Sequence, residues 1–352
     1  MAACGTSSST TAELAAPKTG NGTGQASPIL GANLVDVACA TTNLCAAVGI
    51  GFDPKSETAP FASSSDGGLS WRSDNSSGPA NTKLTSVACG PTGCLAVGRS
   101  LLGALVFRLG SGSTSWSPAT KPTASALAEA TACAARRWCA AIYSDATHRW
   151  MATTLDNGAT WRMGSDLPLG NGPVFRLNCT DASHCIASGT DAQGHGSITA
   201  TSDGGATWTP ANLGSPTVIR VWDAACRTAS DCVALVDVEN ESATALITSS
   251  DGGVSFTAPI TPWSAVASPR ALTCTISSCI IVGGDAGGHG AAAVYSPSGT
   301  GAKIALRFAP TPLISVSCVS ASRCSGAGLG SLVVMTPSVP KGSKQQGGQF
   351  RG

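Results

Sequence analysis

The sequence predicts an all-β chain that folds as one seven-bladed β-propeller, with four-stranded blades and one disulfide hairpin per blade. Fourteen of the 15 cysteines occur in close pairs, and the first cysteines of successive pairs lie 44 to 50 residues apart. This period is typical of propeller blades. Runs of alternating and β-branched residues flank the turn between the cysteines, which indicates a hairpin. The pairs are Cys39 and Cys45, Cys89 and Cys94, Cys133 and Cys139, Cys179 and Cys185, Cys226 and Cys232, Cys274 and Cys279, and Cys318 and Cys324.

The spacing of the pairs favours disulfides. Four or five residues separate the members of each pair, and one pair occurs in each repeat. Zinc is the alternative, but zinc ribbons and fingers favour two-residue spacers and need four ligands brought together. Because disulfides persist in oxidising compartments, seven of them predict an extracytoplasmic protein.

Each repeat also contains enough strands for a blade. The first strand should end at the first cysteine and the second strand begin at the second, as in Leu84–Cys89 and Cys94–Gly98 around a Gly-Pro-Thr-Gly turn. A third and a fourth strand follow on either side of a second turn. The last repeat ends near Met335 before a fourth strand, so we expect residues 24–30 to complete that blade.

A second motif lies between the third and fourth predicted strands of four repeats. Its pattern is Ser/Thr-x-Asp-x-Gly-x-Ser/Thr followed by Trp or Phe, as in Thr201–Trp208. It resembles the Asp-box (BNR) repeat of the sialidase-like, sortilin-like and photosystem II assembly factor-like β-propellers. The second and sixth repeats have lost the aspartate. The four aspartates of the motif are Asp66, Asp156, Asp203 and Asp251.

The residue types of this motif indicate a structural turn. The carboxylate can accept backbone N–H bonds across the turn, glycine supplies a positive φ, and the aromatic ring can pack between blades. A carboxylate with that role is already satisfied. We therefore expect these aspartates to be structural, and the aromatic residues Trp71, Trp161 and Trp208 to belong to the core.

We expect three regions along the chain. Residues 1–29 form a lipoprotein-like N-terminus and a Ser/Thr/Gly tether, 30–338 the propeller and 339–352 a disordered tail. Met1-Ala-Ala-Cys4 resembles the end of a bacterial lipoprotein signal, which would place a lipid on Cys4. The alternative is an ordinary start with one unpaired thiol. The Ala/Gly/Thr bias favours a bacterial protein, lipid-anchored to the cell membrane or secreted.

Composition limits the partners. The net charge is +1 and only 12% of the residues are charged, so no basic field favours nucleic acid. No apolar run approaches the roughly 20 residues of a membrane-spanning helix. We expect a monomer whose only membrane link is the lipid on Cys4.

The candidate binding residues are departures from the repeat at the start of the first strand of each blade. Val, Ala, Ser or Ile hold these positions elsewhere, near the expected mouth of the central channel. One interpretation is that these side chains are only hydrated, and the other is that they form a ligand pocket. The residues are Asp36, Glu129, Arg176, Trp222, Asp223 and Arg270.

Histidines also recur, in turns between the second and third predicted strands, at His148, His195 and His289. Metal binding would require them to converge, but short turns on separate blades keep them apart. We therefore expect no metal and no cofactor.

The predicted function is non-catalytic binding of a protein or glycan partner at the cell envelope. The alternative is an exo-acting glycoside hydrolase of the sialidase type, so the enzymatic status stays open. Sialidases need an arginine triad, a tyrosine nucleophile and an acid aspartate, and they have six blades. The chain has only Tyr143 and Tyr295, both at predicted structural positions, so we assign no catalytic residue.

Overall fold

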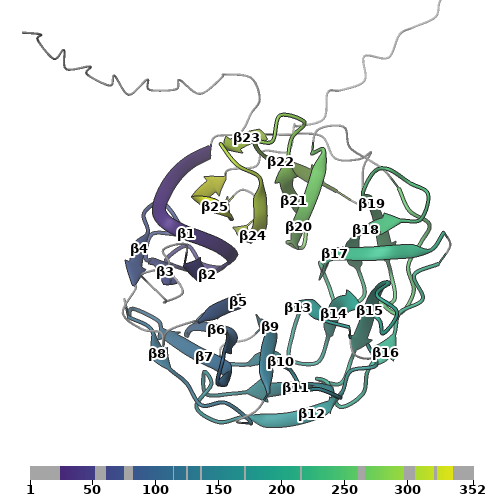
Figure 1. Ribbon diagram of the computed structural model, residues 1–352, viewed down its shortest axis with the longest axis horizontal. Helices are drawn as coiled ribbons and strands as arrows, with labels where there is room; N and C mark the ends of the chain where they lie inside the picture. Colours follow the sequence, from purple (N-terminus) through teal and green to yellow (C-terminus); the bar gives the residue numbers. More distant parts are fainter. Residues whose placement is uncertain are drawn as a thin grey trace, which may run out of the picture.

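The protein is a ring of seven blades around a central channel (Figure 1). The computed structural model describes residues 24–51, 61–74, 82–113, 115–123, 126–134, 137–169, 172–214, 216–260, 266–296, 306–320 and 323–335. The predicted fold class is confirmed. In each blade the first strand lies nearest the channel, and the first strands of successive blades contact one another.

Blades are numbered in chain order. Blades 1 to 3 contain β1 (Gly24–Thr41), β2 (Leu44–Gly51), β3 (Phe61–Ser64) and β4 (Arg72–Asp74); β5 (Lys83–Gly90), β6 (Gly93–Ser100), β7 (Gly103–Gly110) and β8 (Ser117–Pro118); and β9 (Leu127–Cys133), β10 (Cys139–Ser144), β11 (Arg149–Thr154) and β12 (Arg162–Asp166). Blades 4 and 5 contain β13 (Val174–Cys179), β14 (Cys185–Thr190), β15 (Gly196–Thr201) and β16 (Thr209–Pro210); and β17 (Val218–Cys226), β18 (Cys232–Val238) and β19 (Ala245–Ser249). Blades 6 and 7 contain β20 (Ser268–Cys274), β21 (Cys279–Gly284), β22 (Gly290–Tyr295) and β23 (Leu306–Ala309); and β24 (Leu313–Ser320) and β25 (Arg323–Met335).

The ring is closed by pairing between the two ends of the described chain. Gly24–Pro28, at the start of β1, pairs antiparallel with Met335–Ser331 of β25. The second part of β1 then pairs with β2, so blades 7 and 1 share one six-stranded sheet. Backbone hydrogen bonds therefore hold the first blade to the last.

Seven disulfides link the first and second strands of the blades, one in each blade. In every pair the two cysteines face each other across the strands, with Cα atoms 3.9–4.0 Å apart. The predicted pairing is therefore confirmed for all fourteen cysteines. Each disulfide joins the two strands of its hairpin next to the turn. The bonds join Cys39 to Cys45, Cys89 to Cys94, Cys133 to Cys139, Cys179 to Cys185, Cys226 to Cys232, Cys274 to Cys279, and Cys318 to Cys324.

The second cysteine of each pair is buried in its blade. Cys45 is 0% exposed and Cys324 is 1% exposed, so both are structural residues that no ligand can reach from the surface. The prediction that the second strand begins at this cysteine was wrong for three blades, because β2, β6 and β25 begin one residue earlier. Leu44 and Arg323 already pair with the first strand beyond the disulfide. Pairing therefore continues past the bond toward the tip of the hairpin.

The four aspartate turns share one hydrogen-bond pattern. In the first, Ser64 Oγ donates to Asp66 Oδ1 at 2.7 Å, and the Gly68 and Ser70 N–H groups donate to Ser64 Oγ and Asp66 Oδ1. Gly68 has a φ of +90°, which favours glycine. Hydrogen bonds led by that of the Thr207 hydroxyl lower the pKa of Asp203 to about 2. A carboxyl group held in this way is a structural acceptor rather than a proton donor.

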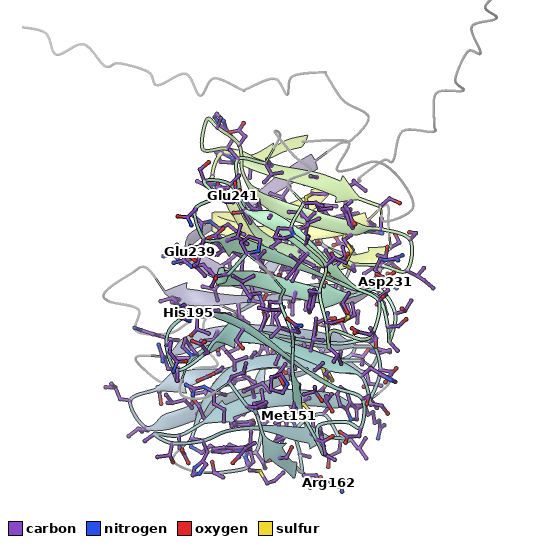
Figure 2. The ribbon with its side chains drawn as sticks, turned by 90° about the vertical axis from the view of Figure 1, so that its right-hand side faces the viewer. Met151, Arg162, His195, Asp231, Glu239 and Glu241 are labelled. Carbon is purple, nitrogen blue, oxygen red and sulfur yellow. A yellow bond between two sulfur atoms is a disulfide. The ribbon has the colours of Figure 1, made fainter. Side chains whose placement is uncertain are left out.

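The two kinds of turn lie on one face of the disc. Gly204 N in an aspartate turn donates to Ser183 O in the disulfide hairpin of the same blade at 2.9 Å, and Gly252 N donates to Ser230 O at 2.8 Å. Figure 2 shows Asp231, next to Cys232, at one edge of the disc, with His195 and Glu241 at the other. We call the side of His195 and Glu241 the mouth face.

Aromatic residues that end the aspartate turns pack against the preceding blade. Trp71 packs against a cluster that includes Ala327 and Leu332 of blade 7, and Phe256 belongs to a cluster that includes Ile186 and Ile198 of blade 4. Trp161 and Trp208 pack likewise against clusters that include residues of blades 2 and 3. These residues belong to the core between blades.

Removing one disulfide should weaken the protein without unfolding the ring. Closing a loop of about seven residues restricts the unfolded chain by about 2 kcal/mol in the chain-entropy model. We expect Cys226→Ser with Cys232→Ser to lower the free energy of unfolding by about that amount, measured by urea denaturation, while the circular dichroism stays native. Loss of the native spectrum in this variant would contradict the expectation that each disulfide stabilises its own blade independently.

Candidate binding site at the channel mouth

A β-bulge occurs at the same place in the first strand of every blade. The pairing with the second strand skips one residue, four positions before the first cysteine. A bulge leaves its extra residue unpaired and turns its side chain to a new direction. The bulge residues are Val35, Thr85, Glu129, Phe175, Trp222, Arg270 and Ile314. Glu129, Trp222 and Arg270 are thus equivalent positions, and Asp36, Arg176 and Asp223 each follow a bulge residue.

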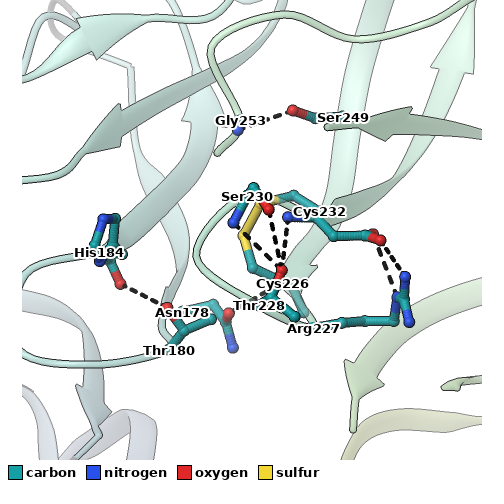
Figure 3. Close-up of a disulfide and its surroundings, with 12 residues drawn as sticks. Asn178, Thr180, His184, Cys226, Arg227, Thr228, Ser230, Cys232, Ser249 and Gly253 are labelled. Carbon is teal, nitrogen blue, oxygen red and sulfur yellow. Dashed lines mark hydrogen bonds and ion pairs between the residues drawn. A yellow bond between two sulfur atoms is a disulfide. The ribbon is translucent and has the colours of Figure 1, made fainter. Parts of the chain in front are cut away.

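Side chains after the bulges bind the next blade around the channel. Asp36 Oδ2 accepts from Val87 N at 2.8 Å, and Asp223 Oδ2 accepts from Leu272 N at 2.9 Å. Ser315 Oγ, in the same position of blade 7, accepts from Val37 N at 3.1 Å. Nearer the disulfide, Asn178 Oδ1 accepts from Cys226 N at 3.0 Å (Figure 3). These bonds satisfy N–H groups that an innermost strand leaves without a sheet partner.

Arg176 spans the channel. It extends from β13 in blade 4, which lies across the ring from β1 and β24 (Figure 1). Its Nη1 lies 3.7 Å from Asp36 Oδ1, and its Nη2 donates to Ile314 O at 3.3 Å. Its Nε lies 3.8 Å from Asp223 Oδ2. The first strands around it line a cavity of about 200 Å³.

Burial dominates the electrostatics of this cluster. Desolvation raises the pKa of Asp223 to about 6, although Arg176 and two backbone N–H groups oppose the rise. Burial alone would lower the pKa of Arg176, but the two aspartates raise it. The guanidinium therefore stays charged between the two carboxyl groups.

The carboxylates of this region already have partners. Asp36 accepts hydrogen bonds from the Ser86 and Ser315 hydroxyls at 2.9 and 2.6 Å, besides its backbone donors. Glu129 accepts from Ser144 Oγ at 2.6 Å and Val174 N at 2.9 Å, and it pairs with Arg149. One interpretation of the sequence placed Glu129 and Asp223 with the four other candidate residues in a ligand pocket. The structure places Glu129 in the junction of blades 3 and 4 and Asp223 beside Arg176.

Trp222 and Arg270 meet on the mouth side of blades 5 and 6. The Arg270 guanidinium carbon lies 4.2 Å from the centre of the Trp222 ring, and that of Arg220 lies 4.6 Å away. Trp222 Nε1 donates to Asp237 Oδ2 at 2.9 Å, and the Thr244 hydroxyl donates to the other oxygen of Asp237. The ring is thus fixed while two cations stack on it.

Among the described residues, neither Arg220 nor Arg270 forms an ion pair, although Asp237 lies opposite Arg220 across the strands. Arg176, Arg149 and Arg227, by contrast, each pair with an acid. The equivalent bulge residue of blade 4, Phe175, is 42% exposed. We call Phe175, Arg220, Trp222 and Arg270 the Trp222 site.

Phe175 and Arg220 were not among the binding residues predicted from the sequence. Phe175 lies four positions before Cys179, and Trp222 lies four before Cys226. Counting back from the cysteines would have placed Phe175 at the mouth with Trp222. Arg220 gave no such signal, because a second pairing irregularity, next to Ile219, precedes it in β17.

The histidines stay in their own turns. His195 lies 3.5 Å from Asp191, His289 lies 3.3 Å from Asp285, and His148 pairs similarly within its turn. Among the described residues, no group of three or more His, Cys, Asp or Glu side chains is placed to hold a metal ion. Each pair therefore stabilises its turn locally.

The proposed anchor and tail lie outside the described residues. These are Cys4 with the rest of residues 1–23, and residues 336–352. In the described ranges, no helix has the length and apolar character to cross a membrane.

No protein-family model and no curated protein sequence matches this chain. Solved propellers resemble it in fold. A structure of YCF48 bound to D1 peptide has a TM-score of 0.67 at 15% identity, covering 92% of this chain and 100% of that one. YCF48 from Cyanidioschyzon merolae gives 0.62 at 13%, with coverage of 89% and 99%. The WD40 propeller domain of Doa1 gives 0.59 at 12%, with coverage of 89% and 96%. The chain therefore shares the fold of the seven-bladed β-propellers.

Asp223 should give the stability a characteristic pH dependence. Its folded-state pKa of about 6 lies above the ordinary 3.8. The stability that its neutral form contributes is therefore complete below about pH 4 and is lost as the pH rises through about 6. We expect Asp223→Asn to remove a decline on the order of 2 kcal/mol over that window, measured as the free energy of urea unfolding. A difference between variant and parent that stays constant with pH would contradict this assignment.

Proposed function

We propose that this protein is a non-catalytic, extracytoplasmic propeller that binds a protein partner at the cell envelope through the Trp222 site. The observation that carries the proposal is the stacking of Arg220 and Arg270 on Trp222, at 4.6 and 4.2 Å, with no described carboxylate paired to either. Tryptophan and arginine are the residues most enriched in binding hot spots. The site is preformed, because Asp237 and Thr244 hold the ring.

The charge of the site indicates the chemistry of the partner. Two guanidinium groups without an ion-pair partner among the described residues attract carboxylates, which they can bind through paired N–H donors. Phe175 on the next blade adds apolar surface. The partner should therefore present an extended acidic segment with an apolar residue. The structure of YCF48 with D1 peptide supports the choice of a peptide ligand, because that protein has the same fold.

The chemistry of the channel argues against glycoside hydrolysis. Asp36 and Asp223 both approach Arg176, but backbone and hydroxyl donors already occupy their oxygens. Tyr143 and Tyr295 are both buried inside blades, and burial raises the pKa of each phenol. A tyrosine nucleophile needs the opposite shift and access to the substrate.

The binding test compares variants of the site with a matched control. Purified oxidised protein is used to capture partners from envelope extracts, beside Arg220→Gln with Arg270→Gln. Arg162→Gln serves as the control, because Arg162 is an exposed arginine on the other side of the disc (Figure 2). We expect the double variant to recover at least about tenfold less of one specific protein, and Arg162→Gln to recover it normally.

Two results would contradict the proposal. Equal recovery by the double variant would remove the Trp222 site as the contact. Capture that survives proteolysis of the extract but not treatment with glycosidases would indicate a glycan ligand. Replacing the acidic residues of the captured segment by amides should abolish its binding.

We propose further that the chain is a bacterial Asp-box propeller and a monomer, held at the membrane by a lipid on Cys4. The seven disulfides support an oxidising compartment, and the four aspartate turns support the Asp-box relationship. We expect Cys4→Ser to move the protein from the membrane fraction to the medium or the soluble envelope fraction. Recovery of wild-type protein in the cytosol with alkylatable thiols would contradict this location.

A further inference from the structure

Two leucines form the tip of the turn between β6 and β7 in blade 2. Ser100 pairs with Gly103, so Leu101 and Leu102 are the two residues of a tight hairpin loop. Their side chains are 88% and 86% exposed, the highest values among the exposed large hydrophobic residues. The Ser100 hydroxyl accepts from Leu102 N at 3.1 Å and helps to hold the turn.

The composition of this loop departs from local turn preferences. Two-residue hairpin loops favour Asn, Asp and Gly. The corresponding turns of blades 3, 4 and 6 contain polar Asp and His residues, as in Asp145–His148 and Asp191–His195. Folding therefore gives no reason for two leucines here, and their exposure costs solubility.

Two cations lie directly behind the leucines. Lys83 of β5 faces Arg99 of β6 across the strands, and both side chains are exposed. Like charges in directly opposite positions destabilise a strand pair. Within the described ranges neither residue has an ion-pair partner. An external anion would relieve this repulsion.

The geometry points to the surface of an anionic lipid bilayer as the occupant, and we propose that Leu101 and Leu102 insert into it. Arg99 lies two residues behind Leu101, or about 7 Å along a strand. Apolar side chains of interfacial segments reach about 5–10 Å into the headgroup boundary, which places Arg99 and Lys83 at the lipid phosphates. A protein pocket is less suited, because leucine is under-represented among binding hot spots.

The rest of the mouth face is compatible with a tilted contact. Blade 2 and blade 5 lie on opposite sides of the ring (Figure 1). The turn after β18 in blade 5 carries the exposed acids Glu239 and Glu241, which anionic lipids repel (Figure 2). If the disc touches the bilayer at blade 2 and is tilted, blade 5 lies farther from the bilayer surface. The Trp222 site, in blades 4 to 6, would then stay open to a partner.

The test measures flotation of the full chain with vesicles. Cys4→Ser removes any lipid anchor, and the vesicles are phosphatidylcholine with about one quarter phosphatidylglycerol. We expect the protein to float with these vesicles and Leu101→Ser with Leu102→Ser to reduce the bound fraction at least about tenfold. Lys83→Gln with Arg99→Gln should abolish the preference for the anionic lipid. Leu155→Ser is the matched control, because Leu155 is 71% exposed in an aspartate turn on the other face.

The outcomes separate this proposal from the partner site. Arg220→Gln with Arg270→Gln should float like the parent, so failure of one proposal does not decide the other. No flotation of the parent, or equal flotation of the leucine variant, would overturn the bilayer contact. Loss of a captured protein in the leucine variant, without flotation of the parent, would assign the tip to a protein contact and also overturn it. Since both leucines are exposed, the melting temperature should not change.

Discussion

The innermost strand of each blade has a free edge, and the architecture depends on how that edge is satisfied. A strand edge left open exposes N–H and C=O groups that need partners. In this ring the partners are side chains of the adjacent blade. Asp36, Asp223 and Ser315 each accept from a backbone N–H of the next blade's first strand. The ring is thus joined at the channel by hydrogen bonds, and farther out by apolar packing between blades.

The acidic side chains at these positions repel one another, and the positive charge of Arg176 offsets that repulsion. Two carboxylates that accept backbone bonds inside a narrow channel repel each other and are poorly hydrated. One guanidinium lies within 4 Å of both and reaches across the ring to do so. The cluster is therefore explained by assembly of the ring. It is also why acids at the mouth of a propeller are weak evidence for catalysis.

The local parts of the structure followed from the sequence because their signals repeat. Each disulfide joins cysteines five or six positions apart, and each aspartate turn is complete within eight residues, so spacing alone defined them. The contacts of Arg176 join blades 1, 4, 5 and 7. Asp36, Arg176 and Asp223 each lie three residues before the first cysteine of their blade, which places them at the channel, but the spacing does not indicate which of them contact one another. The bulges were also hidden. One extra residue shifts the alternation of side chains by one position, and the bulge residues share no residue type that would mark where the shift occurs.

The positions at which the blades differ are the ones that can carry function. Where an equivalent position serves the fold, it keeps a small set of residues: cysteine in the hairpin, Ser or Thr before the aspartate, an aromatic ring after it. The bulge residue pairs with no residue of the second strand, so its type varies between blades, from Val35 to Glu129 and Trp222. The loop between the second and third strands is equally free, since it needs only to reverse the chain. Arg270 and Trp222 are bulge residues, and Leu101 and Leu102 lie in a loop between the second and third strands. The ring therefore holds an aromatic and cationic site at one side of its mouth, where Trp222 also packs against the core of blades 5 and 6, and an apolar tip at the other.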